Sequence, residues 1–212
     1  MATMTALNQV PVRVAPVRRL TQLAAGLWLY GASMAMQIRA TLGLDPWDVL
    51  HEGLTKRTGL SFGLITAITG VVVLLAWIPL RQKPGVGTIA NVVVIAVSVD
   101  VTLALIPAPH ELLPRIVLLT LGIVLNAVAF AAYVGSRLGP GPRDGMVTGF
   151  CRRTGISLRL TRTVIELLVL ATGWLLGGTV GIGTILYALG IGPLSQLFLP
   201  GLTWRERSQP AS

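Results

Sequence analysis

The feature that most constrains this chain is a segment that is written twice. Residues 42–61 read LGLDPWDVLHEGLTKRTGLS, and residues 138–157 read LGPGPRDGMVTGFCRRTGIS, an ungapped match at an offset of 96 residues. The same offset carries GVGTI at 85–89 onto GIGTI at 181–185. An internal repeat constrains the fold more than any local signal, so the chain consists mostly of two copies of one unit.

Composition places both copies in a membrane. Hydrophobic residues make up 53% of the chain and charged residues only 12%, with a mean hydropathy of +0.74, which excludes an ordinary soluble domain. The net charge of +9 comes from Lys and Arg in the loops, so nucleic acid is not an expected partner. A single cysteine, Cys151, excludes an internal disulfide and has no neighbours at metal-ligand spacing. We expect neither a metal nor a cofactor.

Six apolar stretches are long enough to cross a hydrocarbon core about 30 Å thick. They cover residues 20–38, 62–80, 87–107, 115–135, 160–178 and 182–200. The predicted organisation is an N-terminal tail (1–19), a three-span repeat (20–107), a second three-span repeat (115–200) and a C-terminal tail (201–212). Because each copy has an odd number of spans, the second enters the membrane the other way up. The sequence therefore predicts an all-α membrane protein of two inverted-topology repeats.

The loop charges predict the orientation of the chain. Lys and Arg concentrate in the tails and in alternate loops, above all in the basic loop of residues 137–162. Because cytoplasmic loops carry the excess of Lys and Arg, both termini are expected in the cytoplasm.

Each repeated segment predicts a short helix after the first span of its copy. In the first copy Asp45 caps the helix, Pro46 begins it and Gly59 ends it, and Ser61 caps the following span. At about 12 residues the helix is too short to cross the membrane. Either it is amphipathic and lies in the interface with Trp47 among the headgroups, or it is re-entrant and points its cap at a shared cavity.

The positions that both copies share in and beside these segments are expected to be structural. They are Pro46, Pro142, Gly53, Gly149, Arg57, Arg153, Gly59, Gly155, Gly85, Gly87, Gly181 and Gly183. The glycines suit a tight turn into the third span and close helix packing. The arginines are expected either beside helix C-terminal carbonyls or on lipid phosphates.

Polar residues within or beside the apolar stretches form the candidate solute or ion site. The residues chosen are Asp48, Asp144, Asp100, Arg143, Asn91, Tyr187, Arg162 and Glu166. Asp48 and Asp144 are related by the repeat, and they either contribute to one site or only cap their helices. Asp100 is interpreted as an unpaired acid inside a span, an element of a proton relay.

The remaining polar positions leave several alternatives open. Arg143, at the position equivalent to Trp47, either pairs with Asp144 or holds an anion. Arg162 and Glu166, four residues apart on one helix face, form either a structural clamp or part of a proton or ion path.

Four pairs of positions at the repeat offset are polar in both copies, and they are predicted to face a common interior or to join helices by hydrogen bonds. The pairs are Tyr30 and Asn126, Gln37 and Tyr133, Asn91 and Tyr187, and Asp100 and Gln196. His51 and His110 are interpreted as isolated and solvent-facing. No combination of residues typical of an enzyme is present in the sequence.

The segments LGLDPWDVLHEGL and LGPGPRDGMVTGF, together with RTVIE, LLGGTVGIGT and YALGIGPLSQLFLP, carry a family resemblance. Over residues 20–200 the chain resembles the YczE-like group within the YitT-type bacterial integral membrane proteins. The resemblance implies a bacterial cytoplasmic (inner) membrane location and about five or six spans, but no established substrate. A soluble C-terminal domain of the YitT kind is not expected after Trp204.

These observations predict a small secondary transporter or permease for a solute or ion. The alternative is a non-transporting accessory or scaffold protein that binds anionic lipid or a partner protein through its basic loop. The expected partners are membrane lipids, a small solute or ion, and a second copy of the chain.

Overall fold

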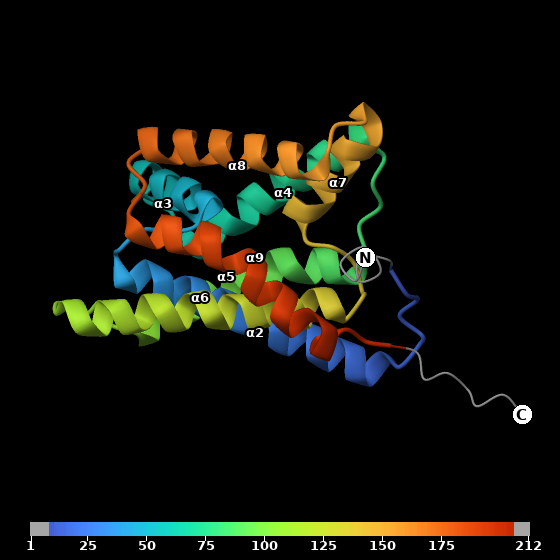
Figure 1. Cartoon of the computed structure of the whole chain (residues 1–212), viewed down its shortest axis with the longest axis horizontal. Helices are drawn as coiled ribbons and strands as arrows, with labels where there is room; N and C mark the ends of the chain where they lie inside the picture. Colours follow the sequence, from blue (N-terminus) through green and yellow to red (C-terminus); the bar gives the residue numbers. More distant parts are fainter. Residues whose placement is uncertain (1–8, 206–212) are drawn as a thin grey trace, which may run out of the picture.

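The computed structural model describes residues 9–205, and every regular element in that part of the chain is a helix (Figure 1). The helices are α2 (Pro16–Ala40), α3 (Pro46–Thr58), α4 (Phe62–Leu80), α5 (Val86–Leu105), α6 (Leu112–Gly135), α7 (Pro142–Thr154), α8 (Leu158–Leu175) and α9 (Ile182–Leu202). The tails predicted at 1–19 and 201–212 lie partly outside the described residues.

Each of the six predicted apolar stretches coincides with one long helix. Within residues 9–205, four helices are long and apolar enough to cross a membrane, namely α4, α5, α6 and α9. Helix α2 is more polar, and α8 carries Arg159, Arg162 and Glu166. The all-helical prediction is confirmed, whereas the arrangement as six spans in two inverted repeats stays a prediction.

The structure repeats at the same offset as the sequence. The first helices of the two copies, α2 and α6, have 25 and 24 residues, and the short helices α3 and α7 have 13 each. The later pairs have 19 and 18 residues in α4 and α8, and 20 and 21 in α5 and α9. Both short helices end at a left-handed glycine, Gly59 with φ 73° and Gly155 with φ 74°. This conformation costs glycine nothing, which is why the helices stop there.

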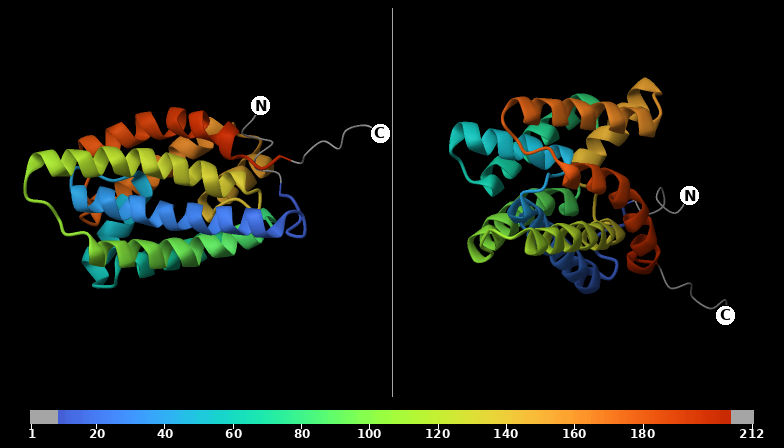
Figure 2. Two further views of the ribbon diagram at one scale, coloured as in Figure 1. Left: turned by 90° about the horizontal axis from the view of Figure 1, so that it is seen from below. Right: turned by 60° about the vertical axis from the view of Figure 1, so that its left-hand side comes forward.

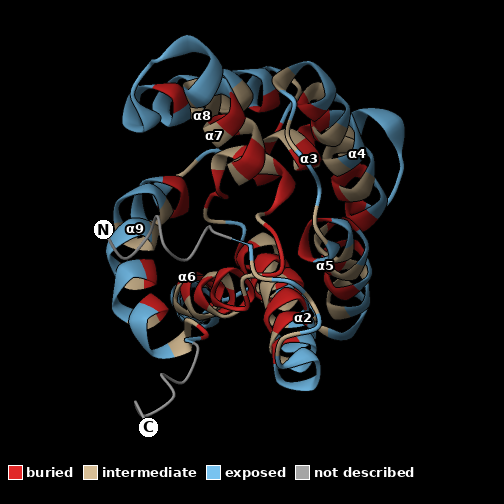
Figure 3. Ribbon diagram, turned by 90° about the vertical axis from the view of Figure 1, so that its right-hand side faces the viewer, coloured by how far each residue is buried: buried red, intermediate tan, exposed pale blue. Residues whose placement is uncertain are grey.

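The helices form two layers along the long axis of the molecule (Figures 1 and 3). In one layer α2 packs between α5 and α6, and α9 lies against α6. In the other layer α3 packs on α8, and α7 packs on α4. The layers are also separate in the right-hand view of Figure 2. Each short helix therefore packs mainly on the second long helix of the other copy.

Two arginines at the repeat offset cap helices of the opposite copy. The Nε of Arg19 donates to the carbonyl of Ser136 at 2.8 Å, at the end of α6. The Nε of Arg115 donates to the carbonyl of Ala40 at 2.8 Å, at the end of α2. The last carbonyls of a helix have no partner within it, so each cation satisfies groups that would otherwise be unpaired.

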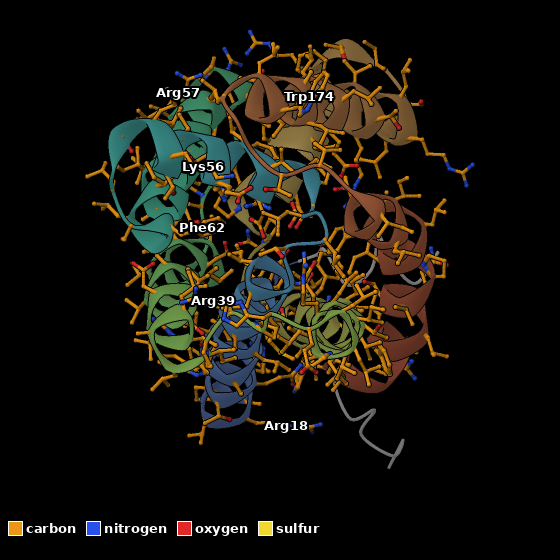
Figure 4. The ribbon with its side chains drawn as sticks, turned by 90° about the vertical axis from the view of Figure 1, so that its left-hand side faces the viewer. Arg18, Arg39, Lys56, Arg57, Phe62 and Trp174 are labelled. Carbon is orange, nitrogen blue, oxygen red and sulfur yellow. The ribbon has the colours of Figure 1, made fainter. Side chains whose placement is uncertain are left out.

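Arg57 and Arg153 make a second reciprocal contact of this kind. Arg57, at the left-hand end of the molecule (Figure 4), donates from Nε to the carbonyl of Leu176 at 3.3 Å, just after α8. Arg153 donates to the carbonyl of Pro79, in the last turn of α4. Both arginines thus lie beside helix C-terminal carbonyls, but the helix in each case belongs to the other copy.

The paired glycines lie where the backbones of the two copies are in close contact. The N–H of Gly87 donates to the carbonyl of Leu138 at 2.9 Å, and the N–H of Gly183 donates to that of Leu42 at 2.8 Å. A Cβ added at Gly85 would lie 2.5 Å from the carbonyl oxygen of Leu138. A side chain at this position would therefore push the copies apart.

Candidate solute site between the two short helices

The short helix α3 begins with the cap that the sequence predicts. The Oδ1 of Asp45 accepts from the backbone N–H groups of Trp47 at 2.8 Å and Asp48 at 3.1 Å. Pro46 follows as the first helical residue, where its missing N–H costs nothing. These bonds hold the carboxyl group of Asp45 at the positive end of the α3 dipole.

The N-terminal ends of α3 and α7 meet inside the molecule. Arg143, in the first turn of α7, lies 3.9 Å from Oδ1 of Asp45 and 3.7 Å from Oδ1 of Asp48. Its guanidinium carbon lies 4.9 Å from the centre of the Trp47 ring, a cation–π contact. Because Trp47 and Arg143 occupy equivalent positions, this contact lies where the two copies adjoin.

A cavity of about 410 Å³ lies at this junction and draws on both layers. Its volume is in the range of small-molecule sites. The polar and aromatic part of its lining includes Tyr30, Asp45, Trp47, His51, Asn91, Tyr133, Arg143, Asp144, Arg162, Glu166, Tyr187 and Gln196. Residues from both copies are therefore needed to form it.

Six of the eight candidate residues chosen from the sequence line this cavity. They are Asp144, Arg143, Asn91, Tyr187, Arg162 and Glu166. Asp48 lies behind the lining and is only 1% exposed, but it is next to Arg143. Arg143 thus pairs with acids of the first copy, whereas Asp144 accepts a hydrogen bond from the Tyr133 hydroxyl at 2.8 Å. Arg162 donates from Nε to Glu166 at 2.8 Å.

Asp100 is not among the residues that line the cavity. Its Oδ2 accepts from the Ser61 hydroxyl at 2.6 Å, and its Oδ1 accepts from the backbone N–H of Gly63 at 2.7 Å. These two donors satisfy its carboxyl group, and no ion pair to Asp100 is present among the described residues, so its role in a proton relay stays a prediction. Asp100 joins α5 to the start of α4.

His51 is buried, with 1% exposure, so its interpretation as solvent-facing is wrong. Its Nδ1 lies 3.2 Å from Oδ1 of Asp48 and 3.3 Å from the hydroxyl of Thr66. That hydroxyl donates its proton to the carbonyl of Phe62, so it accepts from His51. Nδ1 therefore carries the proton, which leaves Nε2 as an acceptor. His110 is exposed, as predicted.

Two buried polar atoms of the cavity lining have no hydrogen-bond partner among the described residues. They are Oδ2 of Asp45, whose side chain is 3% exposed, and Nε2 of His51. Most buried polar atoms in proteins are paired, so an unpaired one marks a place where a ligand, a water or a proton is needed. Both atoms belong to the N-terminal half of α3.

Burial determines the protonation of this cluster. Burial, followed by the nearby charge of Asp48, raises the pKa of Asp45 to about 7, although Arg143 acts in the opposite direction. Burial also raises the pKa of Asp48 and holds the pKa of His51 well below its usual value. Burial alone would lower the pKa of Arg143, but the charge of Asp45 and its neighbours raises it overall. Arg143 is therefore charged and His51 neutral at neutral pH.

Sequence reasoning missed the roles of Asp45 and His51 in the cavity. Asp45 was expected only as a cap, and the spacing of His51 within α3 gives no sign that both flanks of the helix are covered. The pairs of polar positions at the repeat offset were the useful signal, since Tyr30, Tyr133 and Gln196 also line the cavity. Two of these residues, which belong to different pairs, form a helix-to-helix bond: the Tyr187 hydroxyl donates to Oδ1 of Asn126 at 3.0 Å.

Comparison with known proteins finds relatives but no activity. Residues 17–200 match the family model described as "Family of unknown function (DUF6198)". An uncharacterised protein of Haemophilus influenzae is 35% identical over 87% of this chain and 85% of its own length. The uncharacterised membrane protein YczE of Bacillus subtilis is 33% identical over 87% and 86%, which confirms the predicted similarity to YczE. No solved structure matches.

Proposed function

The chain belongs to the DUF6198 family, and from the geometry of its cavity we propose that this membrane protein is a small secondary transporter or permease. One observation carries the proposal: a polar cavity lies where two short helices, one from each copy, meet at their N-terminal ends. Discontinuous helices of this kind form substrate and ion sites at the repeat interface of many transporters.

The proposed topology is six spans in two inverted repeats, with both short helices re-entrant. The reciprocal contacts of Arg19 with Ser136 and of Arg115 with Ala40 support a twofold relation between the copies. A re-entrant placement explains why Asp48 and Trp47 are buried, since a helix lying in the interface would leave one face in contact with lipid or water. It also explains why the two short helices, which lie between spans, are surrounded by protein and the cavity rather than by lipid.

The polarity of α2 and α8 is compatible with spanning. The guanidinium of Arg19 is enclosed by carbonyl oxygens, and Arg162 and Glu166 neutralise each other beside the cavity. Polar and charged groups in a span are tolerated when they face protein or water rather than lipid. We expect the inner membrane of a bacterium, with both termini in the cytoplasm.

The first test is access of water to the cavity. In a Cys151→Ser background, Asn91→Cys and Gln196→Cys should react with a membrane-impermeant thiol reagent in sealed vesicles, because both positions line the cavity. Val99→Cys is the matched control, since Val99 is fully buried outside the lining. It should stay unlabelled until the protein is denatured.

The second test is transport itself. Purified protein in proteoliposomes on a solid-supported membrane should give currents after concentration jumps of one class among amino acids, carboxylates, sugars and organic cations. Arg143→Gln should reduce the current at least tenfold, because this side chain faces the cavity and is 27% exposed. Absence of current from every class, together with unlabelled Asn91→Cys and Gln196→Cys, would overturn the proposal. The accessory or scaffold function, with Arg152 and Arg159 exposed for an acidic partner, would then replace it.

A further inference from the structure

The cluster at the N-terminus of α3 does not balance its charges. Asp45 and Asp48 are 3% and 1% exposed, and one guanidinium, that of Arg143, lies near both. His51 adds no charge, because burial holds its pKa well below the usual value of a histidine, and its bond to Thr66 places the proton of the neutral ring on Nδ1. With both acids ionised the buried cluster would carry a net negative charge. Burying an uncompensated charge is costly, so the cluster needs one more cation, and a proton is the smallest.

Because burial holds the pKa of His51 low, the proton goes to a carboxyl group, and the hydrogen bonds identify which oxygen takes it. Oδ1 of Asp45 already accepts two backbone N–H groups, and Oδ1 of Asp48 faces the N–H of His51. Oδ2 of Asp45 has no partner in the part of the chain that the structure describes, and Asp45 lines the cavity. A proton on that oxygen breaks no existing bond. The pKa of Asp45, raised to about 7 by burial and by Asp48, agrees with this assignment.

The other ionisable groups that face the cavity have partners of their own or are phenols. Asp144 accepts from Tyr133, and Arg162 is paired with Glu166. The remaining phenols of the lining are Tyr30 and Tyr187. Arg143 is therefore the charged group across from Asp45 that responds to its ionisation. At 3.9 Å from Asp45 and 3.7 Å from Asp48, it is held by charge rather than by short hydrogen bonds.

We propose that Asp45 is the proton-binding residue of the cavity and that its ionisation controls Arg143. When Asp45 is ionised, the guanidinium is held between two carboxylates. When Oδ2 of Asp45 takes up a proton from water, Arg143 is held by Asp48 alone and can turn its N–H groups to a solute. The proposal rests on the proposed function and makes the proton its coupling ion. It replaces the relay role that the sequence suggested for Asp100.

Infrared spectroscopy of the purified protein tests the assignment without any solute. The carbonyl-stretch band of a protonated carboxylic acid should be present in mildly acidic buffer and should disappear through a midpoint near neutrality. Asp45→Asn should remove the titrating band. Asp100→Asn, which changes an acid outside the cavity lining, should keep it. A titrating band that survives Asp45→Asn, or its absence from the wild-type protein, overturns the proposal.

Two further variants keep the test decisive if Asp45→Asn does not fold. Asp48→Asn removes the negative charge next to Asp45 and leaves Asp45 as the carboxylate that faces Arg143. The midpoint should therefore move to lower pH. Arg143→Gln removes the one cation that residues 9–205 place beside Asp45, so the midpoint should move to higher pH. Shifts in the same direction, or no shifts, overturn the proposal. The infrared test involves no solute, so the two proposals can fail separately. A titrating band without transport would contradict only the transporter function. Transport without a titrating band would contradict only the proton site.

Discussion

The two copies contain equivalent helices, but these helices do not pack on one another in the same way. In the first copy α4 packs along α5, whereas the equivalent helices α8 and α9 of the second copy do not pack along each other. Gly63 and Asp100 lie at the α4 and α5 contact, and their equivalents are Arg159 and Gln196, both exposed. All four helices line the cavity, but only α4 and α5 pack closely on each other.

The largest expected difference between the copies concerns the two capping arginines. Arg19 is fully buried and donates five hydrogen bonds to carbonyls, whereas Arg115 donates two. Arg19→Met should lower the free energy of unfolding by about 3 kcal/mol or more, because each buried carbonyl left unpaired costs roughly 1–3 kcal/mol. Arg115→Met should cost about 1 kcal/mol. Unfolding in detergent, followed by tryptophan fluorescence, measures both, and equal losses would contradict this ranking.

The helix contact itself can be tested at Gly63. A Cβ at this position would lie 2.1 Å from the carbonyl oxygen of Ala96, so no side chain fits without moving α4. Gly63→Val should therefore destabilise by about 2 kcal/mol through overpacking. Arg159→Val, the matched change in the second copy, should stay within about 0.5 kcal/mol because Arg159 is exposed. Thermal unfolding midpoints compare the two, and a larger effect of Arg159→Val would show that α8 and α9 are closely packed.

The pH dependence of stability should come from the first copy, which alone has an acid at the cap position. The folded state raises the pKa of Asp45 from 3.8 to about 7. Between these values the folded protein holds a proton that the unfolded chain has lost, so stability falls as pH rises. The slope is at most about 1.4 kcal/mol per pH unit. Asp45→Asn should flatten it in unfolding curves recorded across this window. An unchanged slope would mean that another group is responsible.

The smallest expected effect is at Asp100. Asp100→Asn keeps one acceptor oxygen for Gly63 or Ser61 and loses the other, which should cost about 0.5–1 kcal/mol. Gln196→Asn, the matched change in the second copy, should cost nothing measurable because its side chain is exposed beside the cavity. Hydrogen exchange of the Gly63 amide gives a local readout in Asp100→Ala, which keeps neither acceptor oxygen, and protection that survives this change would exclude the bond.

The helices and their ends follow from the sequence because their causes are local. Asp45 before Pro46 begins α3, Gly59 ends it, and Ser61 caps α4, each through groups only a few residues away. The predicted stretch 62–80 matches α4 residue for residue. Polar positions at the repeat offset also predict many of the cavity residues, since positions that are polar in both copies share a structural environment.

The burial and pairing of those residues could be decided only by the tertiary structure. Nothing within α3 shows that α8 covers one flank and α4 another, so His51 could not be recognised as buried. Arg143 and Asp45 lie close together although almost half the chain separates them in sequence. The hydroxyl that donates to Asp100 belongs to Ser61, the cap of α4. The sequence by itself determined two copies of one helical unit, because caps and periodicity act locally. The packing of each short helix on the other copy then determined which acids meet the cavity and which become structural.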